Sequence, residues 1–562
     1  MRRFKLSELV PLTGPVYQRE ALWLQEAESG IDFLRHTAQS EDIVLFVSGP
    51  SCWIHGVLAP TRALTPAALE DAQQTNGPDV GDCWTIQRVF GGGKGHRMYL
   101  EAPLAGTSFN GGEKLVFRRT FHGYEVDGAQ VELSQKLVHS LDLHFIEERS
   151  AYCRLDEHGE LDDVIRLHHE PRSENGEPLH AVTIRRAELD KFMALSGTSL
   201  VFRFDFTRHP REGFFGFHQV EPYERQFAGA CYHGGITPQA SYCNGVFVVA
   251  PGVTRRQLIQ TWKRNDDPKR KQYAEFIVEN LRDGKTTTVS CSPAATANYF
   301  QASTLPLELS PAFFRPELLH KYKSDPDKYR LDDGSIHCRG TWSLRSYAVN
   351  EAGQVHAYLC DLRTLPFTEQ LYWKSFNEPP KAPISDRTFR TDFLGQWDIA
   401  TDPLLELRGL VSRLDVSGAA WWKPRGDRLR DAVHYPRTQS SKEWRDELLA
   451  LDQLLVEGLI ETPLRIWTSD LGREGVAKLR SVRLVQEVLT GLGQEAESAR
   501  RALAPLARLH DLRNVVAGHA TGTKRNQAIR DARGHPGGLP AHFMALLSEC
   551  LEAMTMIESR LQ

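Results

Sequence analysis

The sequence predicts an α+β multidomain protein, in which a β-rich, sandwich-like N-terminal region precedes an all-α helical bundle. The chain has 562 residues, more than one hydrophobic core usually accommodates, so roughly two to four domains are expected. Short apolar or alternating runs dominate the sequence up to residue 375, whereas apolar residues recur at helical spacing after residue 440. The proline-rich segment 378–383 separates the two patterns and should be extended.

The N-terminal region contains runs of β-branched and aromatic residues bounded by Gly, Pro, Asn and Asp, as is typical of strands. The clearest run is 200–206, in which phenylalanines alternate with Val201, Arg203 and Asp205. One face of this strand should be buried and the other wet. The other expected strands are 43–47, 84–90, 114–121, 141–146, 182–185 and 245–250. Sheets packed face to face are the expected outcome.

Helical periodicity interrupts these strands at 134–140, 186–196 and 255–281. It places a boundary near residue 215, between a β-rich region (1–215) and a mixed α/β region (216–377) that is either separate or continuous with the first. A linker and connecting segment (378–439) follows, and the helical bundle occupies 440–562.

Four helices are expected in the bundle. The first begins after Ser440, which has capping-box spacing with Glu443. The second covers 476–492. The third covers about 496–517, where Pro505 should bend the helix or mark its start and Gly518 is placed to end it. The fourth covers about 541–561. Four such helices can close around one core.

The composition indicates a soluble protein of the cytoplasm. The formal net charge is −4 and the pI is near 6.6, which argues against wholesale coating of nucleic acid but allows local basic patches. The cysteines are scattered without a Cys-x-x-Cys pair, as in reduced intracellular proteins. No signal peptide is evident, and no apolar run approaches the roughly 20 residues of a membrane helix. No membrane partner is therefore expected.

The octet 512–519, Leu-Arg-Asn-Val-Val-Ala-Gly-His, carries the strongest functional signal. Arg513 is followed by the polar Asn514, and His519 lies six positions after the arginine. A guanidinium can hold a phosphate by two parallel hydrogen bonds, and an imidazole can accept or donate a proton near neutral pH. Positions six apart on an unbroken helix point about 120° apart, and Gly518 would let His519 leave the helix.

The octet and its flanks, 509–519, resemble the HEPN superfamily, whose helical bundles carry a C-terminal Arg, a polar residue after it and a His four to six positions beyond the Arg. The resemblance covers about the last 120 residues and looks most like the Apea-like HEPN group, found as C-terminal domains of bacterial proteins of unknown or antiviral role. Five residues separate Arg513 from His519, where four is the commoner spacing.

The resemblance implies a metal-independent endoribonuclease. Arg513 would steady the scissile phosphate, His519 would transfer a proton during attack by the 2′-hydroxyl, and Asn514 would position either side chain. The resemblance also implies a site shared across a homodimer or a higher homo-oligomer. It further implies a role in antiphage defence by abortive infection, with RNA as the substrate and a phage-derived trigger.

A second motif, 530–535, has the commoner spacing and precedes Pro-Gly-Gly, where the end of a short helix and a loop are predicted. Its alternative catalytic residues are Arg530, Asp531 and His535. Lys524 and Arg525 lie in the expected loop between the two motifs and are candidates for contacts to RNA phosphates. A solvated basic loop is the alternative interpretation.

A basic cluster at 263–271 supplies further candidates for RNA binding, flanked by aromatic residues that can stack on bases. Its candidate residues are Lys263, Arg264, Lys269, Arg270 and Lys271. A solvated face of a helix and turn explains the cluster equally well. The Gly-rich segment 90–96 lacks Walker spacing, and no Cys and His pairs stand at structural zinc spacing, so no cofactor and no metal are expected.

The alternative to catalysis is a non-catalytic module that binds a nucleotide, RNA or a protein through the same bundle. Arg and His near a helix C-terminus can also serve structure alone, because they interact favourably with the helix dipole. The aromatic segment 365–376 precedes the proline-rich segment and could dock the bundle. We hypothesise that the N-terminal region senses a trigger and holds the nuclease inactive until the trigger binds.

Overall fold

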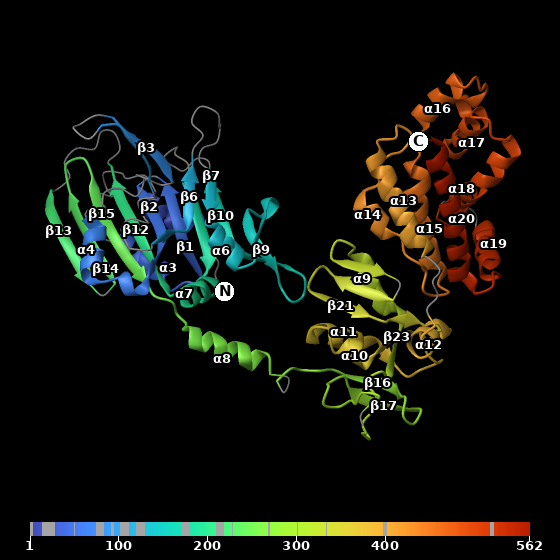
Figure 1. Cartoon of the computed structure of the whole chain (residues 1–562), viewed down its shortest axis with the longest axis horizontal. Helices are drawn as coiled ribbons and strands as arrows, with labels where there is room; N and C mark the ends of the chain where they lie inside the picture. The colour runs from blue at the N-terminus through green and yellow to red at the C-terminus, as the bar shows by residue number, and fades with distance from the viewer. Residues whose placement is uncertain are drawn as a thin grey trace. The chain divides into compact units, whose positions relative to one another are not determined.

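The computed structural model spans the whole chain. The described residues are 4–13, 29–49, 51–74, 84–90, 95–101, 112–119, 130–170, 179–209, 219–227, 229–267, 270–300, 302–332, 334–396, 402–517 and 522–561. The chain divides into two compact units, Met1–Asp156 with Leu161–Lys271, and Glu157–Glu160 with Gln272–Gln562. As predicted, the fold is mixed α+β, with a sheet-rich N-terminal region and a helical C-terminal region (Figure 1).

An 11-stranded antiparallel sheet forms the centre of the first unit. Its strands, in spatial order, are β13 (Val220–Phe227), β14 (Ala230–Ile236), β15 (Ser241–Val249), β12 (Thr198–Arg208), β2 (Cys52–Pro60), β1 (Asp42–Gly49), β11 (Leu179–Arg185), β10 (Leu161–Glu170), β9 (Ala151–Leu155) and β8 (His144–Ile146), with β5 (Glu113–Lys114) paired to β2. Because β12 pairs with β15 from Leu200↔Val249 to Arg208↔Ser241, the boundary expected near residue 215 falls inside one sheet.

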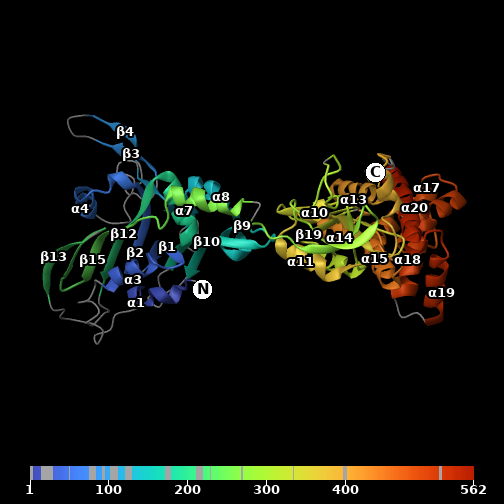
Figure 2. The same cartoon turned by 90° about the horizontal axis from the view of Figure 1, so that it is seen from below.

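Helices cover both faces of this sheet. α3 (Ser29–Thr37) shares a core cluster with the three phenylalanines of β12, whereas α4 (Pro66–Gln74) packs against Val201 and Val246 on the other face. Figure 2 shows α3 and α4 on opposite sides of the sheet. The alternation predicted for 200–206 is therefore confirmed, but the face expected to be wet is covered, with Arg203 only 6% exposed.

Smaller elements complete the first unit. Sheets packed face to face had been expected, but among the described residues the first unit has one large sheet, which α3 and α4 cover, and two two-stranded hairpins. The smaller elements are α1 (Val10–Thr13), α6 (Gln135–Ser140), α7 (Arg186–Ser196), α8 (Arg255–Asn265) and the two hairpins, β3 (Thr85–Val89) with β4 (Arg97–Glu101) and β6 (Val116–Arg119) with β7 (Gln130–Leu133). The alternating apolar runs are satisfied by burial under helices as well as under strands.

The second unit begins with two antiparallel sheets. One contains β17 (Lys285–Ser290), β16 (Glu275–Asn280), β18 (Pro311–Phe314), β23 (Val355–Tyr358), β22 (Ala348–Val349) and β24 (Asn377–Glu378), and the other contains β19 (Tyr329–Asp332), β20 (Ser335–Cys338) and β21 (Trp342–Arg345). They share a core with α9 (His320–Ser324), α10 (Leu359–Leu362) and α11 (Phe367–Phe376). The helix predicted over 255–281 is wrong beyond α8, because Phe276 and Val278 alternate with less buried residues as a strand requires.

The rest of the second unit is helical. Its helices are α12 (Asp386–Asp392), α13 (Pro403–Ser417), α14 (Gly426–Ala432), α15 (Ser441–Leu455), α16 (Glu461–Asp470), α17 (Ser481–Gly491), α18 (Ala496–Ala517), α19 (Gly522–Arg533) and α20 (Gly538–Leu561). The four expected helices correspond to α15, α17, α18 and α20, and Pro505 lies inside α18 rather than at its start. α13 is also part of the bundle, since Leu407, Leu410 and Val411 are buried in the same core, although 378–439 was expected to connect domains.

Lysine and glutamate side chains join the two parts of the second unit. Nζ of Lys323 on α9 donates to Oε1 of Glu443 on α15 and lies 3.5 Å from Oε1 of Glu447. Ser440 caps α15 by accepting from the backbone N–H of Glu443 at 3.4 Å. The Glu443 carboxylate accepts from the backbone N–H groups of Arg437 and Thr438, each at 3.1 Å, so its side chain is directed to these groups and to Lys323.

Candidate functional site

Helix α18 carries the predicted catalytic arginine. Leu503, Leu506 and Leu509 recur three residues apart and are buried in the bundle core, so one face of α18 is fixed by packing. At the N-terminal end the Glu495 carboxylate accepts from the backbone N–H groups of Glu497 and Ser498 at 3.2 and 2.9 Å. Arg513 lies near the opposite end of this rigid helix, which holds its position in the bundle.

Two carboxylates and an amide surround the Arg513 guanidinium. Nη2 donates to Oε1 of Glu457 at 3.2 Å and Nη1 donates to Oδ1 of Asn514 at 3.0 Å. Nε lies 3.5 Å from Oδ2 of Asp452, and the Arg513 side chain is 29% exposed. Asn514, expected to position a catalytic side chain, does contact the arginine, while the guanidinium stays within reach of solvent.

His510 joins this group although only histidines after the arginine had been considered. Its Nδ1 lies 3.0 Å from Oδ1 of Asp452, and its side chain is 43% exposed. His510 lies three positions before Arg513 along α18, and side chains at that spacing share one face of a helix. Helical spacing read backwards from Arg513 would have found His510, but Asp452 lies on a different helix and had no sequence signal.

Asp452 is a fully buried carboxylate, with 0% of its side chain exposed. Burial raises its pKa above the ordinary value, and the hydrogen bond and charge of His510 and then the charge of Arg513 oppose that rise. A carboxylate at Nδ1 fixes the orientation of an imidazole and stabilises its charged form. With Nδ1–H donated to Asp452, Nε2 of His510 is the atom left for proton transfer.

His519 and Gly518 lie outside the described residues, so the structure says nothing of the histidine expected to act with Arg513. Within the described part of the chain, the side chains brought together are those of Asp452, Glu457, His510, Arg513 and Asn514. We call these five residues the α15–α18 site.

The alternative motif lies on and after α19. Nη2 of Arg530 donates to Oε1 of Gln527 at 2.8 Å, and Nε2 of Gln527 donates to Oδ1 of Asp531 at 2.7 Å. Nδ1 of His535 lies 2.9 Å from the Pro536 carbonyl oxygen, beyond the end of the helix. These contacts are local, and each joins residues that are at most one helical turn apart.

Lys524 and Arg525 are exposed, but they lie on α19 and not in the loop that had been predicted between the two motifs. Of the basic cluster in the first unit, Lys263 and Arg264 are exposed on α8, which has no buried residue. Arg270 is exposed, Nζ of Lys271 lies 4.0 Å from Oδ1 of Asp266, and Lys269 lies outside the described residues. A capping box between Thr254 and Gln257 begins α8.

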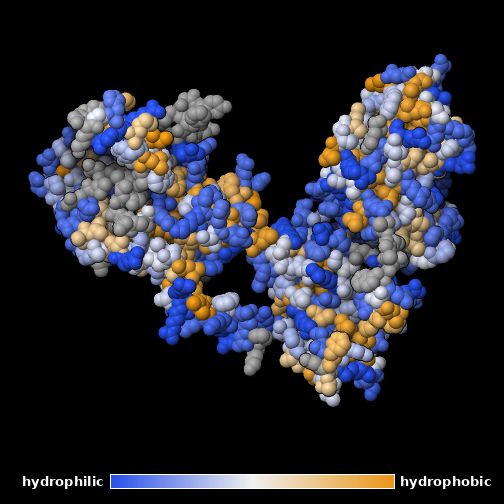
Figure 3. Space-filling view, viewed as in Figure 1, coloured by the Kyte–Doolittle hydropathy of each residue, from blue (hydrophilic) through white to orange (hydrophobic). Residues whose placement is uncertain are grey.

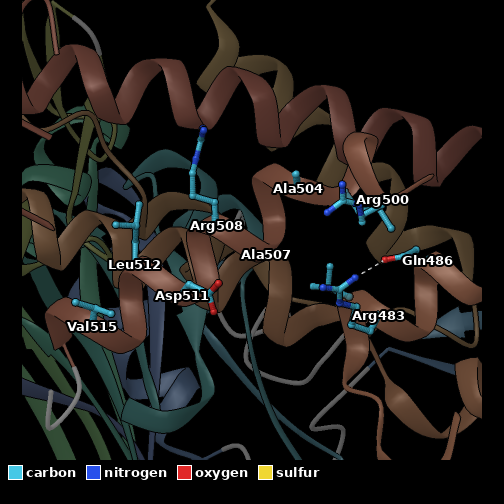
Figure 4. A pocket seen from close by; sticks show the side chains of 11 residues that line it. Arg483, Gln486, Arg500, Ala504, Ala507, Arg508, Asp511, Leu512 and Val515 are labelled. Carbon is cyan, nitrogen blue, oxygen red and sulfur yellow. Dashed lines mark hydrogen bonds between the residues drawn. The ribbon is translucent and has the colours of Figure 1, made fainter. Parts of the chain in front are cut away.

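A cavity of about 410 Å³ lies between α17 and α18, on another side of α18. Figure 4 shows its apolar wall and the long side chains of Arg483, Arg500 and Arg508. Arg483 is hydrogen-bonded to Gln486 at 2.8 Å, while Arg500 pairs with Glu497 at 2.6 Å and Arg508 pairs with Glu549. Asp511 also lines the cavity, so three arginines and one carboxylate lie around its apolar wall. The excess of arginines suits a small anion that has an apolar part.

Among the described residues, no three His, Cys, Asp or Glu side chains converge as a metal site would need. No helix in the described part of the chain combines the length and apolar character required to cross a bilayer. No protein-family model matches the sequence, and neither a curated protein nor a solved structure matches it. The resemblance to the HEPN superfamily therefore stands on residues 509–519 and the helical pattern around them.

Proposed function

We propose that the helical part of the second unit is a HEPN-like, metal-independent endoribonuclease regulated by the sheet-rich N-terminal region, with a role in antiphage defence. One observation carries this proposal: a buried carboxylate, Asp452, orients the partly exposed His510 beside Arg513. Arginine suits a phosphate and an oriented imidazole suits proton transfer, so the pair supplies the two functions that metal-free RNA cleavage requires.

In this mechanism Arg513 binds a non-bridging oxygen of the scissile phosphate. Nε2 of His510 accepts the proton of the 2′-hydroxyl, the 2′-oxygen forms a bond to phosphorus, and the bond between phosphorus and the 5′-oxygen breaks. His519 would give a proton to the departing 5′-oxygen. The products are a 2′,3′-cyclic phosphate and a free 5′-hydroxyl.

Glu457 is the side chain that RNA would displace. It accepts from Nη2 of Arg513 at 3.2 Å and is 43% exposed, whereas Asp452 is completely buried. A phosphate can therefore replace Glu457 at the guanidinium while Asp452 stays in place. Truncating Glu457 should tighten RNA binding.

The test is cleavage of a defined single-stranded RNA by the full-length protein in EDTA. We expect Arg513→Ala, His510→Ala and His519→Ala each to remove cleavage, while His535→Ala and Arg530→Ala retain it. Circular dichroism would establish that each variant is folded, and mass spectrometry would identify the cyclic phosphate. Wild-type protein that stays inert, alone and with phage-infected lysate, would refute the nuclease. Loss of cleavage only in the Arg530 and His535 variants would refute the α15–α18 site and assign catalysis to the alternative motif.

The second candidate is a non-catalytic nucleotide-binding module, and the cavity between α17 and α18 favours it. Its three arginines lie around an apolar wall contributed partly by Leu503 and Val515. Under this alternative, a nucleotide binds the wild-type protein and Arg500→Gln weakens it, while Arg513→Ala leaves affinity unchanged. The opposite pattern, with no nucleotide affinity and RNA cleavage that needs Arg513, would eliminate it.

The proposal includes a cytoplasmic homodimer. An apolar groove of about 700 Å³, lined by residues that include Leu414, Trp421, Ile466 and Trp467, supports it, because a second copy of the chain could cover this surface. Figure 3 shows apolar side chains at the end of the bundle near α16. Ile466 is 59% exposed, and Ile466→Glu should convert the dimer to a monomer in light scattering. A monomeric wild type would refute the dimer.

A further inference from the structure

A row of polar and aromatic side chains crosses the sheet of the first unit on the face that carries α4. Directly opposed residues of antiparallel strands project from the same face. The row follows the strand register through six strands, from β10 to β15: His169↔His180, His180↔Ser48, Ser48↔Trp53, Trp53↔Asp205 and Asp205↔Asn244. The sequence pattern had predicted this face of β12 to be wet, and the structure covers much of it.

Basic side chains concentrate in and beside this row. Arg203 pairs with His55 in the neighbouring row, and Lys114 on β5 pairs with Val57, two residues from His55 on the same face. His55, Arg203 and Lys114 are 3%, 6% and 7% exposed. Arg118 lies over the Trp53 ring, with its guanidinium carbon 5.7 Å from the ring centroid.

These groups are close enough to influence one another. Burial lowers the pKa of His55 most, and the positive charges of Lys114, Arg203 and Arg118 lower it further. Burial, His169 and Arg118 together lower the pKa of His180 to about 4. Both imidazoles are therefore neutral at pH 7, and they lie beside the buried Lys114 and Arg203 and the half-buried Arg118.

His180 supplies an independent sign that something binds here. It is 6% exposed, its Nδ1 lies 3.2 Å from Nδ1 of His169, and its Nε2 has no hydrogen-bond partner among the described residues. A buried polar nitrogen without a partner costs free energy unless a ligand or water completes it. This nitrogen belongs to the row in which Arg118 covers Trp53.

The acidic residue of the row is directed elsewhere. Asp205 accepts from the Thr207 hydroxyl at 2.5 Å. Burial raises its pKa, and the charges on its carboxyl come from His233 and His209, on the opposite side of the row from His180. Within the row, Asp205 is thus directed towards β14, whereas His180 lies on β11.

We propose that His55, Lys114, Arg118, His180 and Arg203, which we call the basic face, bind the phosphoryl group of a small molecule. Concentrated cations with neutral imidazoles beside them match an anion that accepts several hydrogen bonds. Trp53, which is partly exposed in the same row, offers a surface for an organic part of the ligand. The site lies in the first unit, so it does not depend on the proposed nuclease activity.

The experiment is isothermal titration of the full-length protein with inorganic phosphate and, separately, with adenosine 5′-monophosphate at fixed ionic strength. Arg118→Gln and His180→Gln should each weaken binding by about 10-fold or more, the usual effect of removing a charged or buried hydrogen-bonding group. Arg119→Gln is the matched control, because Arg119 is the next residue of β6, is exposed and pairs with Glu132. The affinity of Arg119→Gln for both probes should stay within about twofold of the wild-type affinity.

The two probes distinguish two sources of the phosphoryl group. Tighter binding of the nucleotide than of phosphate indicates an organic phosphate that also contacts the surface near Trp53, and equal affinities indicate recognition of phosphate alone. No binding of either probe at about 20 mM would overturn the proposal, as would equal losses in Arg118→Gln and Arg119→Gln. If His180→Gln fails to fold, the affinity of Arg118→Gln tests the proposal, because substitution of this half-buried residue leaves the strand pairing intact.

Discussion

Nδ1 of His510 lies 3.0 Å from Oδ1 of Asp452, although the two residues are 58 positions apart in the sequence. The pair joins α18 to α15 and places a buried carboxylate behind a partly exposed imidazole. Arg513 reaches the other carboxylate oxygen of the same aspartate at 3.5 Å. One buried charge therefore orients both the proposed proton acceptor and the proposed phosphate ligand.

Replacing Asp452 with Asn should lower kcat/KM for RNA cleavage by about 100-fold, because the neutral amide no longer stabilises the His510 imidazolium. Asp446→Asn is the matched control on α15, where Asp446 is exposed and contacts Arg445. An Asp452→Asn enzyme with the kcat/KM of wild type would contradict the assigned role.

Glu447 should make the stability of the second unit depend on pH. Burial raises its pKa from 4.5 to about 7, with Glu443 adding to the rise and Lys323 and the His434 N–H opposing it. Between these values the folded protein keeps a proton that the unfolded chain has lost. Its stabilising effect is therefore complete below pH 4.5 and is lost as the pH rises towards about 7. When the pH is lowered from about 8 to about 5, wild type should gain stability relative to Glu447→Gln, as measured by urea unfolding.

Glu443→Gln is the contrasting variant. The pKa of Glu443 is lowered: burial is the largest influence and raises it, but Lys323 and the hydrogen bonds of Thr438 and Arg437 together outweigh burial. This carboxylate is therefore ionised in both states above its ordinary pKa, so its own titration adds no pH dependence to the stability between about pH 8 and about pH 5. Because the Glu443 charge also raises the pKa of Glu447, Glu443→Gln should keep the gain in stability at lower pH but reduce its size. Burial lowers the pKa of His434 to about 3, so the stability that His434 contributes increases as the pH rises towards 6.5. Wild type and both variants contain His434, so this contribution cancels when their stabilities are compared. Parallel curves for wild type and Glu447→Gln would refute the assignment.

The basic residues of α8 should contribute to RNA affinity through charge alone. Lys263→Gln with Arg264→Gln should lower the slope of log Kobs against log salt concentration by about 1.4 for single-stranded RNA, if each side chain contacts one phosphate. Filter binding between about 50 and about 200 mM salt measures this slope. Arg62→Gln, an exposed arginine of the first unit, is the control. An unchanged slope in the double variant would show that α8 makes no phosphate contact.

Tyr322→Phe should destabilise the second unit by about 1–3 kcal/mol, because it leaves a buried indole N–H without its acceptor. Nε1 of Trp373 donates to the Tyr322 hydroxyl at 2.8 Å, and that hydroxyl donates to Glu369. Tyr372→Phe removes one hydrogen bond, to the Leu318 carbonyl at 2.9 Å, at a half-buried position and should cost less. Urea unfolding followed by tryptophan fluorescence compares them. Equal losses of unfolding free energy in the two variants would mean that the buried Tyr322 network contributes no more than the single hydrogen bond of Tyr372.

Local sequence patterns predicted many elements, because periodicity depends on which side of an element is buried. The strand over 200–206 and the helix over 496–517 appear where they were expected. The same patterns failed at 275–280, where a strand follows Pro268 although the helix had been expected to continue to 281, and at 403–417, where a helix of the bundle lies in the expected connecting segment. A short apolar run specifies burial but does not specify which core will bury it.

The sequence by itself determined the mixed α+β fold, the adjacency of Arg513 and Asn514 and the helical spacing of His510 and Arg513. Tertiary structure alone decided that Asp452 lies behind His510 and that Glu457 accepts from Arg513. It also decided the basic face, in which strand register brings His55, Arg203 and Lys114 together. The physical reason is that periodicity encodes the direction of a side chain within one element, whereas helix packing and strand pairing select its neighbours from distant parts of the chain.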